Sequence, residues 1–283
     1  MDEITSQKTE EPTSSEIQSV KEVLREEFDR RIYELHTYIS DLETILETSL
    51  TRWFVVPPVM GRTDFGYLND IDFVVLTPLP TQQDYEQVSA LTQRHLEERK
   101  VFFTPNFITE EEFQEMEVHT PEMFSWYQDR LSRPKPEGKK ARYDGFFDQA
   151  EKLESRLRKS LSPAEKEKLR QERLKTAGQF IKEAQSEVEI IAWTVSGSTT
   201  GNLEKFGTSS DLDLDILTDP KDEDQERICW RHLHQYLTWK YAEEKGIKID
   251  CGEWTIKHLK QFSRVNPKMK KFFERMFDIK LGS

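Results

Sequence analysis

The sequence predicts an α/β fold of the α+β kind, with two tandem mixed sheets flanked by helices and with long helical segments. The main observation is a pattern that occurs twice: an apolar strand, a glycine, a polar loop, an Asp-x-Asp strand, a helix and a further strand. The acidic pairs are Asp70 and Asp72 in the first copy and Asp211 and Asp213 in the second. A chain of 283 residues has room for two domains, each with its own core.

The first half is predicted to begin with a long helix, because apolar residues recur there at three- and four-residue steps. An apolar strand follows, and Pro57-Pro58 restricts it to a sheet edge or a strand end. The expected elements are a helix over about 14–50, strands over 53–59 and 71–77, a helix over 83–100, a short strand over 101–103 and a helix start at 109.

A linker is predicted over 133–143, where proline, glycine and charged residues concentrate. We therefore divide the chain into a disordered leader (1–15), a first domain (16–132), this linker and a second domain (144–283). The second domain is expected to contain helices over 145–159, 163–185 and 222–245 and strands over 188–195 and 247–251. Ser162 and Glu165 form a capping-box pattern at the second helix, and Gly246 ends the third.

Charge divides unevenly between the halves. Residues 1–132 carry 27 acidic and 11 basic side chains, whereas 133–283 carry 26 and 30, within a total of −12. The acidic first half disfavours nucleic acid and suits a protein partner, so a phosphate-bearing ligand is expected on the second half.

No apolar run approaches bilayer length, and the start lacks signal-peptide features, so we expect a cytoplasmic protein without membrane contact. Cys229 and Cys251 lack metal-ligand spacing and are expected to be reduced.

The second copy carries the residues that point to chemistry. Val195 leads into Gly197-Ser198, a turn able to bring backbone N–H groups to a phosphate. Asp211 and Asp213 then alternate with leucines, and side chains at i and i+2 of a strand lie on one face about 7 Å apart. Two carboxylates so placed can share hard cations such as Mg²⁺ or Mn²⁺.

Asp250 supplies a third carboxylate on a later strand. Three carboxylates on adjacent strands, together with nucleotide phosphates, can hold two magnesium ions about 3.5–4 Å apart. Asp250 is also a candidate general base.

These elements resemble the nucleotidyltransferases of the DNA polymerase beta superfamily, whose signature is a Gly-Ser turn, a loop, an Asp-x-Asp strand and a third acid. Here they read Gly197-Ser198, Ser210-Asp211-Leu212-Asp213 and Ile249-Asp250, and the resemblance covers roughly 181–262. It implies transfer of a nucleoside monophosphate from an NTP, with ATP expected, to a hydroxyl acceptor: an RNA end, a protein or a small molecule. It also implies that Asp211, Asp213 and Asp250 bind magnesium and that Gly197, Ser198 and Ser210 bind the nucleotide.

Several alternatives stay open at this point. Asp213 and Asp215 offer a competing register, although the preceding Ser210 favours Asp211 and Asp213. Ser198 either contacts a phosphate or caps the following turn. The first copy is degenerate, because Arg62 replaces the serine and 101–104 contains no acid. A noncatalytic nucleotide sensor and an acidic, antitoxin-like interaction protein are the other two function classes.

Overall fold

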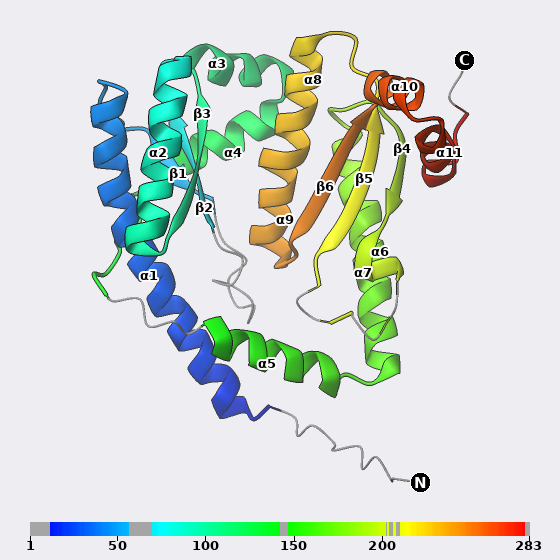
Figure 1. Cartoon of the computed structure of the whole chain (residues 1–283), viewed down its shortest axis with the longest axis horizontal. Coiled ribbons are helices and arrows are strands. Elements are labelled where there is room, and N and C mark those ends of the chain that lie inside the picture. The colour runs from blue at the N-terminus through cyan, green and yellow to red at the C-terminus, as the bar shows by residue number, and fades with distance from the viewer. Residues whose placement is uncertain are drawn as a thin grey trace. The chain divides into compact units, whose positions relative to one another are not determined.

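The chain forms two compact units, Met1–Ser160 and Leu161–Ser283, in a computed structural model that describes residues 12–56, 70–141, 147–201, 203, 206–207 and 210–280 (Figure 1). Each unit contains a three-stranded mixed sheet flanked by helices, which confirms the predicted fold class. Residues 1–11 of the predicted leader and the segment 57–69, with Pro57-Pro58 and Arg62, lie outside the described residues, whereas residues 14 and 15 of that leader already belong to the first helix.

The first unit contains these helices and strands, in chain order: α1 Ser14–Ile45, β1 Trp53–Val55, β2 Asp70–Leu76, α2 Gln82–Arg99, β3 Phe102–Ile108, α3 Glu110–His119, α4 Pro121–Ser132 and α5 Phe147–Ser160. Thr13 caps α1 through a capping box with Glu16. The edge position predicted for the first strand is confirmed, because the sheet order is β1-β2-β3.

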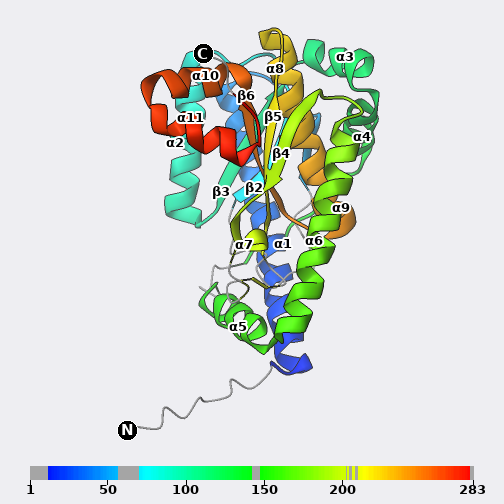
Figure 2. The same cartoon turned by 90° about the vertical axis from the view of Figure 1, so that its right-hand side faces the viewer.

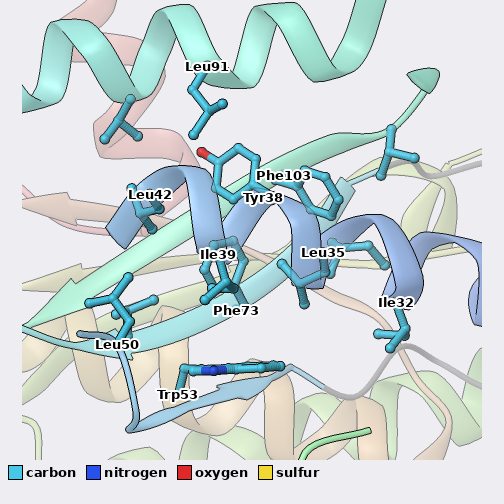
Figure 3. Packing of buried hydrophobic residues seen from close by; sticks show 14 residues of the cluster. Ile32, Leu35, Tyr38, Ile39, Leu42, Leu50, Trp53, Phe73, Leu91 and Phe103 are labelled. Atoms are coloured by element: carbon cyan, nitrogen blue, oxygen red, sulfur yellow. The ribbon is translucent and has the colours of Figure 1, made fainter. Parts of the chain in front are cut away.

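Aromatic side chains from α1, β2 and β3 form the centre of the first core. Tyr38, Phe73 and Phe103 are buried and meet at ring-centroid distances of 4.7–6.5 Å (Figure 3). The Tyr38 hydroxyl also shares a 2.7 Å hydrogen bond with Thr92 of α2. These contacts join the sheet to two helices and give the first unit its own core.

The segment predicted as a linker packs against α1 over its described part. The Lys139 N–H donates to the Asp29 carbonyl at 2.9 Å, and His36 contacts the Pro136 carbonyl at 2.9 Å. Gly138 lies so close to α1 that an added Cβ would overlap the Tyr33 backbone. The division between the units therefore falls after Ser160 rather than within 133–143.

The second unit contains these elements, in chain order: α6 Pro163–Ala184, β4 Ile190–Val195, α7 Gly197–Thr200, β5 Leu212–Thr218, α8 Glu223–Trp230, η2 Arg231–Leu237, α9 Thr238–Lys245, β6 Ile249–Thr255, α10 Ile256–Val265 and α11 Pro267–Met276. The Ser162–Glu165 capping box and the left-handed Gly246 at the end of α9 are present as predicted.

The two sheets share one topology. In each, the first strand pairs antiparallel with the second, and the second pairs parallel with the third. In each, helices connect the second and third strands: α2 in the first unit, and the continuous α8, η2 and α9 in the second. The predicted duplication therefore extends to strand order and direction.

The two faces of the β4-β5-β6 sheet carry different layers (Figures 1 and 2). Trp254 of β6 packs on Phe273 of α11 with ring centroids 4.9 Å apart, so α10 and α11 cover one face. The next residue toward the N-terminus, Glu253, lies beside His234 of η2 on the opposite face. We call these the α11 face and the η2 face.

The structure differs from the sequence prediction in several elements. The short strand over 101–103 is instead β3, which continues through Pro105 to Ile108, as an edge strand can because proline need not donate toward solvent. The helix over 222–245 contains the π-helical turn η2. Helices α10 and α11 were not anticipated. Both cysteines are free, as expected.

Candidate functional site

The acidic residues of β5 lie on the α11 face. Leu212, Leu214 and Ile216 are at most 1% exposed, whereas Asp213 and Asp215 between them are half-buried. This alternation is the two-residue period of a strand, and it holds the carboxylates on a rigid, buried support. Asp211 precedes the first strand residue and is also half-buried.

Asp250 is the direct neighbour of Asp213 across the parallel pair β5–β6. Register partners of adjacent strands project on the same face, so the third predicted carboxylate lies beside the second. Asp250 is exposed, whereas its neighbours Ile249 and Cys251 are buried. The structure therefore brings together the strand pair that the sequence predicted.

The Gly-Ser turn lies against the Asp213 carboxylate. Gly197 has a φ of +63°, in the left-handed region, and a Cβ at this position would overlap the Asp213 Oδ2 atom. The Ser198 backbone N–H donates a hydrogen bond to the same carboxylate. Glycine is therefore required at position 197 for two reasons: it tolerates the left-handed φ, and it has no Cβ to overlap the Asp213 carboxylate.

The pKa of Asp213 is raised above its ordinary value. Burial is the largest cause, and the charges of Asp250, Asp211 and Asp215 follow in that order, while the hydrogen bond from Ser198 lowers it. Like charges close together disfavour ionisation, and a bound cation would reverse that effect. The site is consequently a local concentration of negative charge.

Asp211 and Ser210 make different contacts. The Asp211 carboxylate forms an ion pair with Lys248 at 3.1 Å. The Ser210 hydroxyl accepts from the Gly207 N–H at 2.9 Å and shapes the preceding loop.

Asp215 is held by two donors. The Ser196 hydroxyl donates to Oδ2 at 2.9 Å, and the Trp254 indole N–H donates to Oδ1 at 3.0 Å. Gly252, its register partner on β6, leaves the necessary space, because a Cβ there would lie 2.7 Å from Oδ1. Both oxygens of Asp215 are thus engaged within the protein, which favours Asp211 and Asp213 as the ligand pair.

Sequence reasoning missed Ser196, Gly252 and Trp254 as parts of this site. The signal for Gly252 and Trp254 lay in the two-residue spacing of β6, where both share one face with Asp250. A glycine between an acid and a tryptophan on one face is an indication of close approach by a neighbouring side chain.

The first unit differs from the second at the strand position that corresponds to Asp250. Asp72 on β2 is the register partner of Thr104 on β3, just as Asp213 is the partner of Asp250. A hydroxyl therefore occupies the place of the third carboxylate. The expectation that the first copy lacks this acid is confirmed, and the residue in its place is Thr104.

The donor set of the second unit fits a hard divalent cation in chemistry and charge. All its ligating atoms are carboxylate oxygens, and Mg²⁺ is usually held by one or two carboxylates with waters and substrate phosphates. Among the described residues, no group of three or more acidic, histidine or cysteine side chains is arranged to hold a metal ion by itself. A cation here would take its remaining ligands from water or from a bound phosphate.

Comparison with family models and curated proteins assigns the chain to no family. No protein-family model matches the chain, and no curated protein matches it either. None of the helices in the described ranges has both the length and the apolar content needed to cross a membrane.

Proposed function

We propose that the second unit is a metal-dependent nucleotidyltransferase that transfers a nucleoside monophosphate from an NTP, with ATP the expected donor, to a hydroxyl acceptor. The observation that carries this proposal is the Asp213–Asp250 register pair beside the left-handed Gly197 turn. It joins two carboxylates on a buried sheet to a backbone turn at the same point. Phosphoryl transfer relies on this combination, because its catalysis is mainly positioning and neutralisation of charge.

In this proposal, Asp213, Asp250 and Asp211 bind Mg²⁺ or Mn²⁺ together with the phosphates. When bound, the cation supplies charge neutralisation at the phosphates and lowers the pKa of the attacking hydroxyl. The shared negative charge that raises the pKa of Asp213 supports this assignment. Asp211 is available on exchange of its surface ion pair with Lys248, since such pairs contribute little free energy.

The protein's own groups then have separate tasks. The exposed Asp250 accepts the proton of the acceptor hydroxyl while the oxygen of that hydroxyl forms a bond to the α-phosphorus. The bond from the α-phosphorus to the bridging oxygen breaks, and pyrophosphate leaves with the electron pair. The backbone N–H of Ser198, which donates to the Asp213 carboxylate, is the turn donor that this proposal assigns to a phosphate oxygen. Ser210 contributes by shaping the loop before Asp211.

Calorimetric titration with ATP in the presence and absence of Mg²⁺ tests the binding step. We expect magnesium-dependent binding by the unaltered chain, and its loss in Asp211→Asn/Asp213→Asn. Asp72→Asn is the matched control, because Asp72 has the same strand position in the first unit but faces Thr104. Binding that survives the double substitution, or that is lost in the control, would refute the assignment.

A noncatalytic nucleotide sensor is the second candidate. It is favoured by one observation: within the described ranges, no three ligands converge as a ready metal site. A sensor would bind the NTP with magnesium as above but release no pyrophosphate.

A further inference from the structure

A cavity lies in the same unit, on the η2 face of the sheet. Its volume is about 600 Å³, and it is bounded by α8, η2, the end of β6 and the start of α10. Glu253 and Thr255 of its lining alternate along β6 with Asp250, Gly252 and Trp254, so the cavity and the carboxylate site occupy opposite faces. This volume is in the range of small-molecule sites.

At the floor of this cavity, the Glu253 carboxylate lies beside a His234 ring nitrogen that has no hydrogen-bond partner among the described residues. The Glu253 side chain is only 8% exposed, and its Oε1 atom accepts from the Thr218 hydroxyl at 3.1 Å. Its Oε2 atom lies 3.8 Å from His234 Nε2, which is too long for a hydrogen bond. His234 Nε2 is buried and has no hydrogen-bond partner in the described part of the chain.

Burial fixes the protonation of this pair at mildly alkaline pH. It lowers the pKa of His234, which is therefore neutral, and raises the pKa of Glu253 to about 7. Above that pH, Glu253 is a carboxylate that only accepts, and its charge favours the imidazole tautomer with the proton on Nε2. The floor then offers one donor and one acceptor side by side.

One wall of the cavity is aromatic. Trp230 is 45% exposed and stacks on His234 with a centroid distance of 5.5 Å and an interplanar angle of 23°. A flat ligand that is hydrogen-bonded edge-on to His234 lies in the plane of the imidazole ring. Its plane is therefore inclined to the Trp230 indole by about the same small angle as the imidazole, and this orientation allows it to stack on the indole.

The rim carries charges of both signs. Arg227 and Lys257 supply cations, whereas Glu226 lies 3.7 Å from His258. A monophosphate suits this rim better than a triphosphate, because the carboxylates of Glu223 and Glu226 repel additional negative charge.

From these contacts we infer that the cavity is a second nucleotide site, which takes a nucleoside monophosphate whose base has an amino group beside a ring nitrogen. The amino group donates to Glu253 Oε2, the ring nitrogen accepts from His234 Nε2, and the base stacks on Trp230. Arg227 and Lys257 bind the phosphate. Adenine and cytosine have this edge, whereas hypoxanthine and uracil present the reverse order of donor and acceptor. The inference does not depend on the proposed transferase activity.

Calorimetric titration of the full chain at pH 8 with EDTA tests this site, using AMP, CMP, IMP and UMP. We expect one site for AMP and CMP, and binding weaker by about tenfold or more for IMP and UMP, because these leave buried polar groups unpaired. Trp230→Ala should weaken AMP binding by a similar factor. Trp193→Ala is the matched control, since Trp193 is 40% exposed on β4 and does not line the cavity.

Three results would overturn the inference: equal binding of all four nucleotides, a preference for IMP and UMP, or AMP binding unaffected by Trp230→Ala. Retention of AMP binding in Asp211→Asn/Asp213→Asn would support it, because the carboxylate site is then disabled. Loss of AMP binding in that double variant would assign the nucleotide to the carboxylate site instead.

Discussion

Asp213 and Asp250 are register partners on adjacent parallel strands of the second unit. Asp72 and Thr104 hold the corresponding positions in the first unit. One chain thus contains the same strand geometry twice, once with two carboxylates and once with a carboxylate and a hydroxyl. The first unit is therefore an internal reference for what the second carboxylate does.

Asp250→Thr converts the second unit to the pattern of the first. We expect the pKa of Asp213 to fall, because the charge of Asp250 is the largest electrostatic cause that raises it. An acid with a raised folded-state pKa destabilises the fold above that pKa, so the variant should be more stable than the unaltered chain at neutral pH. Carboxyl NMR titration and urea unfolding measure the two effects. An unchanged pKa of Asp213 would contradict the close placement of the two carboxylates.

Gly197→Ala should destabilise the second unit by about 1–3 kcal/mol, because alanine is strained at a left-handed φ and its Cβ would overlap the Asp213 carboxylate. Gly178→Ala is the matched control. Gly178 lies within α6 with no atom within 4 Å of an added Cβ, so this change should stabilise the chain by about 0.5–1 kcal/mol. Urea unfolding measures both, and equal effects of the two substitutions would contradict the turn geometry.

Ser196→Ala and Trp254→Phe each remove one donor to Asp215. Each should lower the free energy of unfolding by about 1–3 kcal/mol, as is typical for a hydrogen bond to a charged group. Combining either change with Asp215→Asn should show a clear coupling energy in a double-mutant cycle. Additive effects would mean that Asp215 is not held by these donors.

Glu253 predicts a specific pH dependence. Burial raises its pKa from 4.5 to about 7, so between these values the folded state binds a proton that the unfolded state has lost. Stability should therefore fall as pH rises through this window, by up to about 3 kcal/mol, and then level off. Glu253→Gln should lack this component when urea unfolding is compared at pH 4.5, 6 and 8. Parallel pH profiles for the two proteins would exclude a buried, titrating Glu253.

The regular elements of this fold were predictable from local signals. The capping box of Ser162 and Glu165 set the start of α6, and the Asp-x-Asp alternation identified β5. That the strand of Asp250 lies beside the Asp-x-Asp strand was also anticipated from the order of the motifs.

Features that depend on tertiary contacts were not predictable. β3 continues through Pro105 only because it is an edge strand, and this depends on the sheet order. The π-helical turn η2 has no sequence signal that periodicity detects. The contacts of Asp215 with Ser196 and Trp254 join residues 19 and 39 positions apart, so the spacing within β6 places Trp254 on the face of Asp250 but does not identify Asp215 as its partner.

Pyrophosphate release is the most direct test of the proposed transferase. The measurement uses each of the four NTPs with Mg²⁺, in a cell extract that can supply the acceptor, with Asp211→Asn/Asp213→Asn and Asp72→Asn beside the unaltered chain. We expect pyrophosphate release, highest with ATP, that the double substitution abolishes and Asp72→Asn preserves. No release above the double variant from a folded, ATP-binding protein would contradict the enzyme assignment and leave a nucleotide sensor.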